Sequence, residues 1–387
     1  MQFISLFSGA GGLDLGLEAA GLECLLATDH NADAIETLRI NKYAARLDTR
    51  IVEADIRNLT GKNMLAAVGR PRGDVPVLAG GPPCQSWSSG GLQLGFADPR
   101  GRLVEEYLRI ASEIDARWLV FENVRGLLTA RGLDGKPGTA LAAIRSELLR
   151  RGWQTKVELL NAADFGVAQR RNRLIILGYR AGDGPTFPTG THAQAEWVSM
   201  RNCLATIEPV KADEIIRPTG KMAEELRDIV PGSGVKSPGK AETTRPGGHW
   251  GYKQGAFVAD LDRPARTVTA SSQQDWIRDP VYGLRRLCPR ECAALQGFPA
   301  HWAFSGKRVS QYRQIGNAVP PALAQAVGTV LMAHDRASPE ISARWSDVAP
   351  LPYRLQSAVR YTEREEARNG DSRRSVSKRP SATAVGS

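Results

Sequence analysis

The chain has 387 residues, 42% hydrophobic side chains and a formal net charge of +10, which allows two domains with cores and permits a polyanionic partner. No run approaches the roughly 18 apolar residues of a membrane span, and the short apolar start lacks the basic leader of a signal peptide. The five cysteines fall at neither disulfide-framework nor zinc-finger spacing, so we expect a reduced protein without a bound metal.

Short apolar runs alternate with helical stretches through the first half of the chain. The runs predict buried strands, and the segments between several of them have the apolar spacing of amphipathic helices. Predicted strands cover residues 3–7, 24–28, 50–54, 75–79 and 118–121, and predicted helices cover residues 32–41 and 103–114. This alternation is typical of a doubly wound α/β domain with a parallel sheet.

Two further strands, at residues 155–160 and 173–179, follow a helical pattern at residues 139–151. Only a loop separates these two strands, which predicts that they pair in antiparallel fashion. From about residue 182 to residue 279 the chain is rich in Pro, Gly, Lys, Arg and Thr, which indicates a separate, loop-rich domain.

Helical patterns return at residues 289–296 and 321–333. After Pro339 the composition turns polar and rich in Arg and Ser, which predicts a disordered tail.

The segment FSGAGGLD, residues 7–14, follows the first strand and opens a helix. Its glycines let the backbone approach a ligand, but Asp14 stands where a dinucleotide site would have its third glycine. A carboxylate there repels a pyrophosphate, so we expect a nucleoside cofactor without phosphates. Asp29, which ends the second strand, suits ribose hydroxyls, and Asp55 with Ile56, which end the third, suit adenine. Alternatively, both aspartates are ordinary caps and turns.

Two prolines precede Cys84 in the segment GGPPCQS, residues 80–86. They predict a rigid turn that holds Cys84 at the carboxyl edge of the sheet, which suits a nucleophile better than a buried hydrophobe. Glu122 ends the fifth strand beside apolar neighbours, so it is a candidate for a raised pKa and for a proton donor; the alternative is a helix cap. Arg171 and Arg173 share one strand face at period two. Alternatively, these arginines are solvated or pair with a strand-end acid.

Seven segments, in this order along residues 1–335, resemble those of DNA cytosine-5 methyltransferases of the prokaryotic restriction-modification type. They are FSGAGGLDLGLEAAG, GGPPCQSWS, GFADPRGRL, FENVRG, QRRNRL, RRLCPRECAALQGFP and QIGNAVPP. The resemblance implies a Rossmann-like, S-adenosylmethionine-dependent methyltransferase domain at residues 1–183 and 314–338. It also implies a smaller target-recognition domain at residues 184–313, and it ends before the basic tail at residues 339–387.

The resemblance further implies a set of site residues and no metal. The cofactor S-adenosylmethionine would be held by Phe7, Gly9, Gly11, Leu13, Asp29, His30, Asp55, Ile56, Pro82, Leu103, Asn317 and Val319. Catalysis would fall to Cys84, Glu122, Arg171 and Arg173. DNA contacts would come from Gln85, Ser86, Ser88, Arg100, Arg245, Lys253, Arg266 and Thr267.

The implied chemistry starts from the electron-poor C5 of cytosine. A thiolate of Cys84 that adds at C6 makes C5 nucleophilic, while Glu122 hydrogen-bonds or protonates N3 and Arg173 contacts O2. Methyl transfer, loss of the C5 proton and elimination of Cys84 complete the reaction, and the base that takes this proton is not evident in the sequence. Because C5 and C6 are stacked in a duplex, the cytosine must flip out.

Two other functions compete with this one. A dinucleotide-dependent oxidoreductase shares the fold, but the missing third glycine and the PPCQ segment argue against it. An RNA (tRNA) cytosine-5 methyltransferase of the same family is a closer rival, but the Cys-Phe-Thr tripeptide usual in that branch is absent. We therefore expect a monomeric bacterial cytoplasmic enzyme that acts on double-stranded DNA without membrane contact, with a cognate restriction endonuclease as a partner in function only.

Overall fold

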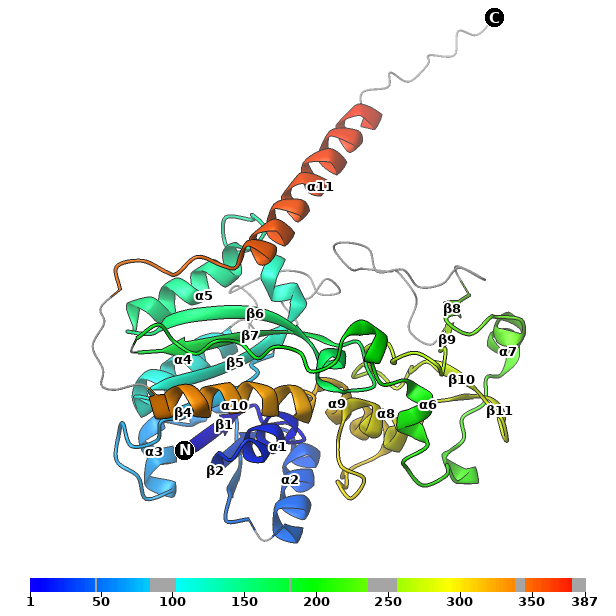
Figure 1. The fold of residues 1–387 in the computed structure, drawn as a ribbon, viewed down its shortest axis with the longest axis horizontal. Coiled ribbons are helices and arrows are strands. Elements are labelled where there is room, and N and C mark those ends of the chain that lie inside the picture. Colours follow the sequence, from blue (N-terminus) through cyan, green and yellow to red (C-terminus); the bar gives the residue numbers. More distant parts are fainter. Residues whose placement is uncertain (46, 84–101, 181, 236–255, 338–344, 378–387) are drawn as a thin grey trace, which may run out of the picture.

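The computed structural model describes residues 1–45, 47–83, 102–180, 182–235, 256–337 and 345–377. A seven-stranded sheet with helices on both faces forms the larger part, and a four-stranded sheet with shorter helices lies at the other end of the molecule (Figure 1).

The large sheet has the strand order β3-β2-β1-β4-β5-β7-β6. Its strands are β1 (Gln2–Leu6), β2 (Glu23–Asp29), β3 (Arg50–Glu53), β4 (Val77–Gly80), β5 (Trp118–Val124), β6 (Gln154–Asn161) and β7 (Asn172–Tyr179). The first five run parallel, whereas β7 is antiparallel to both β5 and β6. All seven predicted strands are present within a few residues of their predicted bounds, and the antiparallel pairing of the last two is confirmed.

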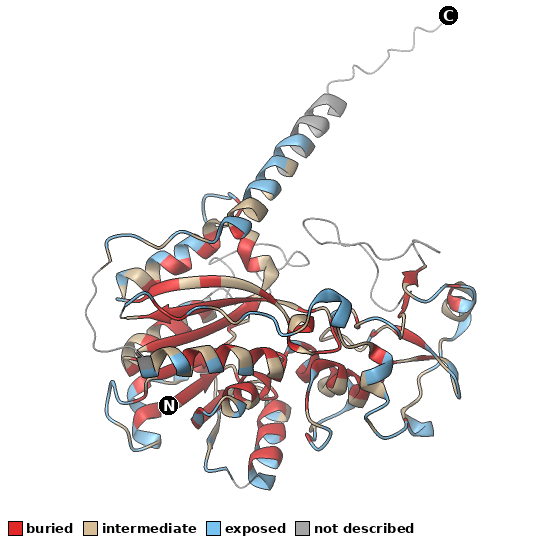
Figure 2. Ribbon diagram, viewed as in Figure 1, coloured by how far each residue is buried: buried red, intermediate tan, exposed pale blue. Residues whose placement is uncertain are grey.

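Side chains of the large sheet alternate between two helical layers. On β5, Leu119 and Phe121 belong to one apolar cluster, and Trp118 and Val120 belong to the other. The first layer contains α3 (Gly61–Ala67), α4 (Arg102–Ile114) and α5 (Thr139–Arg150), and the second contains α1 (Gly12–Ala19), α2 (Ala32–Ala44) and α10 (Pro321–Ala337). Both faces of the sheet are therefore covered, and its strands are largely buried (Figure 2).

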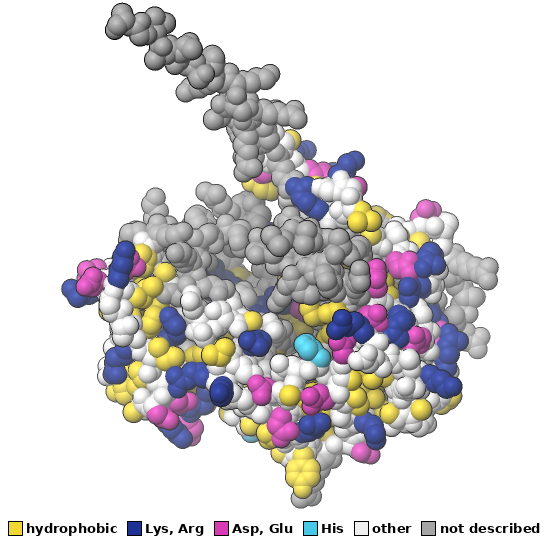
Figure 3. All heavy atoms as spheres, turned by 180° about the vertical axis from the view of Figure 1, so that it is seen from behind, with side chains coloured by type: hydrophobic (Ala, Val, Ile, Leu, Met, Phe, Trp, Pro, Cys, Tyr) yellow, Lys and Arg dark blue, Asp and Glu magenta, His cyan; other side chains and the backbone are white. Residues whose placement is uncertain are grey.

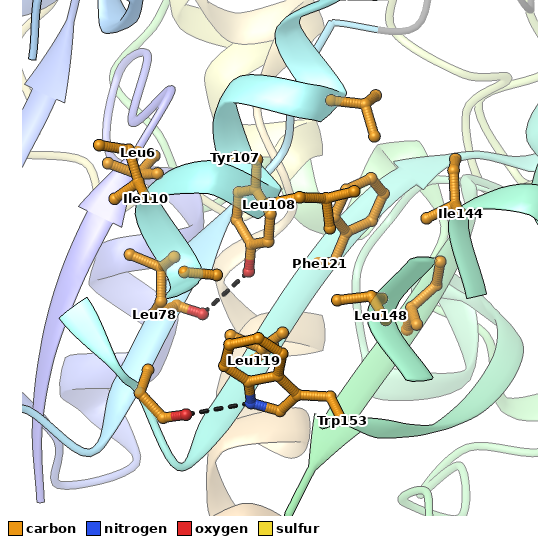
Figure 4. Close-up of a cluster of buried hydrophobic side chains, with 14 of the residues drawn as sticks. Leu6, Leu78, Tyr107, Leu108, Ile110, Leu119, Phe121, Ile144, Leu148 and Trp153 are labelled. Carbon is orange, nitrogen blue, oxygen red and sulfur yellow. Dashed lines mark hydrogen bonds between the residues drawn. The ribbon is translucent and has the colours of Figure 1, made fainter. Parts of the chain in front are cut away.

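The polar atoms inside the first layer have partners. The Tyr107 ring of α4 stands edge-on to Phe121, with 5.1 Å between ring centroids, and its hydroxyl donates to the Leu78 carbonyl at 3.0 Å (Figure 4). The Trp153 indole donates to the Ala116 carbonyl at 3.0 Å. Large aromatic side chains thus fill this layer without leaving these donors unpaired.

The second part of the molecule is built on a small sheet of order β11-β10-β9-β8. Its elements are α6 (Met200–Leu204), α7 (Gly220–Arg227), β8 (Ser233–Gly234), β9 (Phe257–Val258), β10 (Trp276–Asp279), β11 (Gly283–Arg286), α8 (Pro289–Gln296) and α9 (Arg308–Asn317). A core that includes Phe257, Ile277, Leu295 and Tyr312 joins this sheet to α8 and α9. This is the region where the sequence predicts a recognition domain, and its bounds at residues 184–313 stay a prediction.

After α9 the chain returns to the large sheet, because α10 packs against α1 in the second layer. This return confirms the expected place of the last predicted helix. Among the described residues, only the helical region at residues 308–336 contains an 18-residue window apolar enough to span a membrane, with a mean hydropathy of 1.2 over that window. Since 61% of that window is buried inside the protein, a core helix explains its composition.

The prediction of a disordered tail was wrong for the part from Trp345 onward that the structure describes. Trp345 stands edge-on to Tyr179, and α11 (Tyr353–Ser377) begins with Leu355 buried in the first layer. Only the start of α11 packs on the body, and the rest projects outward (Figure 1). The few apolar residues of this region are divided between the non-helical segment at residues 345–352 and the first turns of α11. Their sequence therefore has no clear helical periodicity.

Among the residues that the structure describes, the basic side chains do not gather in one patch on the face opposite to that in Figure 1. Basic and acidic side chains are interspersed there (Figure 3). Net charge therefore does not identify a partner on that face of the molecule.

Candidate active site

A cavity of about 230 Å³ opens at the carboxyl ends of β1, β2 and β3. It is lined by Phe7, Thr28, Asp29, His30, Ala54, Asp55, Ile56, Arg57, Pro83 and Leu103. Six of the predicted cofactor residues are in this set. The four lining residues that sequence reasoning missed, Thr28, Ala54, Arg57 and Pro83, each directly adjoin a predicted one. The carboxyl edge of a parallel sheet is where such folds bind their ligands.

Asp29 ties the glycine turn to the end of β2. One carboxylate oxygen accepts from the Gly9 amide and the other from the Asn31 amide, both at 2.9 Å, and His30 Nδ1 lies 3.3 Å from the second oxygen. Burial acts to raise the pKa of Asp29, but the hydrogen bonds from His30, Asn31 and Gly9 outweigh it and lower the pKa below its usual value. Asp29 therefore stays ionised and presents a fixed acceptor to the cavity.

Asp55 is a second permanent anion in the cavity. It caps the short helix at Ile56–Asn58 and pairs with Arg57, whose side-chain and backbone hydrogen bonds lower the pKa of Asp55 to about 2. Ile56 is buried beside it. An acid next to an apolar side chain can hold both the edge and the face of an aromatic ring.

Phe7 holds an unusual backbone conformation between β1 and the glycine turn. Its φ angle is 55°, and among the described residues only Asp115 shares a positive φ without being glycine. Such left-handed residues cost free energy and concentrate at functional sites. Phe7 lines the cavity and also packs against the apolar cluster of the first layer.

The other six predicted cofactor residues do not line this cavity. Gly9, Gly11 and Leu13 form the glycine turn and the start of α1, and the Pro82 carbonyl accepts from Asn123. Asn317 ends α9, and the Val319 carbonyl packs against Gly12 of the turn.

Glu122 and Arg173 form a buried ion pair across the antiparallel strands β5 and β7. Arg173 lies opposite Val124, so its side chain shares a face with Glu122 two residues away. Arg173 Nε is 2.8 Å from Glu122 Oε1, and both residues are less than 10% exposed. Burial raises the pKa of Glu122 even though Arg173 and Arg171 act to lower it.

The end of β5 also braces the turn that leads to Cys84. A Cβ placed on Gly81 would lie 2.5 Å from Glu122 Oε2, so a side chain at this position would displace the carboxyl group. Asn123 Nδ2 donates to the Pro82 carbonyl at 3.1 Å. Cys84 itself lies outside the described residues, but its turn begins in contact with Glu122.

Arg171 is held inside the protein by backbone carbonyl groups. Its guanidinium donates to the carbonyls of Val268, Gly316 and Ala318, and the residue is fully buried. These bonds occupy both terminal nitrogens, which argues against the predicted contact between Arg171 and substrate.

Most predicted DNA contacts lie outside the described residues, namely Gln85, Ser86, Ser88, Arg100, Arg245 and Lys253. Arg266 is engaged within the protein, because it pairs with Asp275 at 2.9 Å and lies 4.0 Å over the Phe257 ring. That arrangement argues against a role for Arg266 in reading bases. Thr267 is exposed, and its hydroxyl donates to the Arg170 carbonyl at 3.0 Å.

The chain matches a family model and known methyltransferases over most of its length. Residues 1–333 match the model of the C-5 cytosine-specific DNA methylase family. The Type II methyltransferase M1.HphI of Haemophilus parahaemolyticus is 33% identical over 340 residues, 86% of this chain and 87% of that protein. M.Eco47II of Escherichia coli is 35% identical over 354 residues, 84% of this chain and 77% of that protein.

Solved structures share the fold at lower identity. The S. pombe Dnmt2 methyltransferase superposes with a TM-score of 0.62 at 17% identity, covering 86% of this chain and 98% of its own. A prophage-encoded protein of E. coli, titled a DNA modification methyltransferase, gives 0.60 at 21% identity, covering 86% and 99%. The predicted methyltransferase fold is therefore confirmed. From the family match and the identity to these relatives, the chain belongs to the C-5 cytosine-specific DNA methylases and is a DNA cytosine-5 methyltransferase.

Proposed function

We propose that this enzyme transfers a methyl group from S-adenosylmethionine to C5 of a flipped-out cytosine in a specific duplex sequence, through a covalent bond between Cys84 and C6. The observation that supports it most is the buried Glu122–Arg173 pair, against which the turn leading to Cys84 is braced. The Type II names of the relatives suggest a restriction-modification context, in which a partner endonuclease cleaves the unmethylated sequence.

The cavity suits a nucleoside cofactor without phosphates. Two carboxylates with lowered pKa values, Asp29 and Asp55, would repel a pyrophosphate but can accept hydrogen bonds from ribose hydroxyls and an adenine amino group. Phe7, Ile56 and Leu103 offer apolar surface for the adenine ring. When bound, S-adenosylmethionine supplies an electrophilic methyl group.

The protein groups then act on the cytosine. Thiolate addition from Cys84 forms the S–C6 bond, and the electron pair of the C5–C6 double bond becomes available at C5. A proton on Glu122 hydrogen-bonds N3 and stabilises the charge that develops there, and the raised pKa keeps this proton in place closer to neutral pH. Arg173 orients Glu122 and offers its cation to O2. After C5 has taken the methyl group, its proton passes to a base, the C5–H electron pair re-forms the C5–C6 double bond, and the S–C6 bond breaks to return Cys84 as a thiolate.

The test is bisulfite sequencing of DNA from cells that lack other cytosine methyltransferases and express the chain. We expect conversion-resistant cytosines in one short sequence context, and none in cells that express Glu122→Gln. RNA from the same cells serves as the control for the tRNA alternative. Resistant cytosines confined to RNA, or absent from both nucleic acids with a folded wild type, would contradict the proposal.

A further inference from the structure

Arg171 stands at a junction of three segments that are far apart in the sequence. It directly precedes β7, and its Nη1 donates to the Val268 carbonyl at 2.8 Å. Its Nη2 donates to the Gly316 carbonyl at 2.6 Å and to the Ala318 carbonyl at 2.9 Å. No carboxylate is among its hydrogen-bond partners in the described residues, so this buried cation is held largely by carbonyl dipoles.

One of these segments belongs to the predicted recognition domain. Residues 265–268 run alongside residues 168–171, because the Arg170 amide donates to Ala265 at 2.8 Å and the Ala265 amide donates to Ala168 at 2.9 Å. Gln169, also fully buried, accepts from the Val268 amide at 2.8 Å. The Val268 peptide is therefore fixed at both its amide and its carbonyl by the segment that enters β7.

The other contacts of Arg171 lie next to the glycine turn, which is tied to the cavity residue Asp29 through the Gly9 amide. The two carbonyls that it holds, those of Gly316 and Ala318, flank Asn317. Next along the chain, the Val319 carbonyl packs so closely on the glycine turn that a Cβ on Gly12 would lie 2.3 Å from it. A shift of this segment would therefore press directly on the glycine turn.

The two segments also touch each other without a side chain between them. A Cβ placed on Gly316 would lie 2.1 Å from the backbone of Thr269. The end of α9 therefore packs directly on the backbone of the predicted recognition domain. In addition, Gln296 of α8 donates to the Ala318 carbonyl at 2.6 Å. A close-packed interior leaves no free space into which a segment can shift alone. A displacement of Val268 should therefore also displace residues 316–319, because Arg171 contacts both segments.

We propose that Arg171 is a positioning residue that couples the recognition segment at residues 265–270 to the cofactor pocket, so that DNA and cofactor each tighten the binding of the other. The inference rests on the cofactor pocket of the proposed function. A lysine at position 171 would keep the charge, but its single nitrogen cannot reproduce the planar fork that reaches three carbonyls.

The experiment measures coupling instead of activity. Calorimetry gives the Kd of S-adenosylhomocysteine with and without a duplex that carries the sequence found by bisulfite sequencing, and the Kd of that duplex with and without S-adenosylhomocysteine. The two ratios must agree, because linkage is reciprocal. In the wild type we expect a ratio of at least about fivefold, within the usual range of such couplings. In Arg171→Lys and Arg171→Met the ratio should fall towards one.

Arg145→Met is the matched control. Arg145 of α5 is also a buried arginine that donates to carbonyls, those of Thr155 and Ala349, but it lies away from both sites. This variant should lose stability and keep the wild-type ratio. Arg171→Lys is the milder change and keeps the test valid if Arg171→Met does not fold.

Two results would overturn the inference while leaving the proposed function in place: a wild type that binds both ligands without coupling, or an Arg171→Lys variant that retains the full ratio. A wild type that does not bind S-adenosylhomocysteine at all, or that methylates no DNA, would overturn both.

Discussion

Carboxyl groups on two sides of the large sheet, one at β2 and β3 and the other at β5 and β7, have pKa values shifted in opposite directions. At the ends of β2 and β3, Asp29 and Asp55 accept hydrogen bonds from backbone amides and cations, and their pKa values are lowered. At the end of β5, Glu122 is buried between strands, and its pKa is raised although Arg173 lies beside it. The carboxyl edge of the sheet thus lowers the pKa of the carboxyl groups after β2 and β3 and raises the pKa of the one near the end of β5.

The difference follows from what surrounds each group. The turns after parallel strands expose free backbone amides, which favour a charged carboxylate. The antiparallel pairing of β5 with β7 encloses Glu122 and removes it from water, which favours the neutral form. Ribose hydroxyls bind well to a fixed hydrogen-bond acceptor, whereas N3 of a cytosine under attack at C6 needs a proton.

The largest effect is expected from Glu122→Gln. The amide keeps the shape but cannot supply a proton, so turnover should fall by about 10²–10⁴-fold while cofactor affinity stays the same. In the wild type, the rate should fall as rising pH removes the Glu122 proton, and this fall should be missing from the residual rate of the variant. Methylation kinetics across pH measure both. Turnover close to that of the wild type would remove Glu122 from the chemistry.

The next effect concerns the start of α11, which packs on the first layer of the large sheet. Leu355→Ala should lower the free energy of unfolding by about 2–5 kcal/mol, because it empties a buried site beside α5. Tyr353→Ala, at an exposed position two residues away, is the control and should change little. Urea unfolding compares the two, and equal stabilities would mean that the tail does not pack as described.

A third effect tests a carboxyl group beneath the glycine turn. Asp14 is fully buried and hydrogen-bonded to Ser5, and burial raises its pKa to about 6 although Lys42 acts to lower it. The folded state therefore holds a proton that the unfolded state releases above its ordinary pKa of 3.8. Stability should fall by up to about 3 kcal/mol as pH rises from 4 to 6, and Asp14→Asn should lack this fall. Parallel urea-unfolding curves for the two proteins across this range would refute the assignment.

The smallest effect is expected from Asp29→Asn at the cofactor end. The amide can accept only on its oxygen and places an NH₂ group against a backbone amide, so cofactor affinity should fall about ten- to hundredfold. Turnover at saturating cofactor should stay near that of the wild type. Glu36→Gln, on the exposed side of α2, is the control for lost charge. A loss of turnover at saturation, without weaker binding, would contradict the separation of the two ends.

The sequence allowed the sheet and its cavity to be predicted because both depend on local signals. Apolar runs marked the strands, and Asp29, Asp55 and Glu122 each lie within two residues of a strand end. An ion pair of Arg173 with a strand-end acid was among the alternatives, and the pairing of β5 with β7 identifies that acid as Glu122.

Other features depend on contacts between distant segments, which no local pattern reveals. Arg171 and Arg173 look alike in sequence, yet Arg171 meets carbonyls from residues 268, 316 and 318. Arg266 looked like a DNA contact because its partner Asp275 lies across a loop. Leu355 looked like part of a polar tail because the apolar cluster that it joins is formed by residues far from it in the sequence.

The central claim is the covalent bond to Cys84, and a mechanism-based trap tests it most directly. A duplex with 5-fluorocytosine at the target is incubated with enzyme and S-adenosylmethionine, and the products are separated under denaturing conditions and mapped by mass spectrometry. Fluorine at C5 cannot leave as a cation, so elimination stalls after methyl transfer. We predict a cofactor-dependent protein–DNA adduct on the peptide that contains Cys84, absent in Cys84→Ser. No adduct on a duplex whose ordinary cytosine is methylated well, or an adduct that persists in Cys84→Ser, would contradict the mechanism.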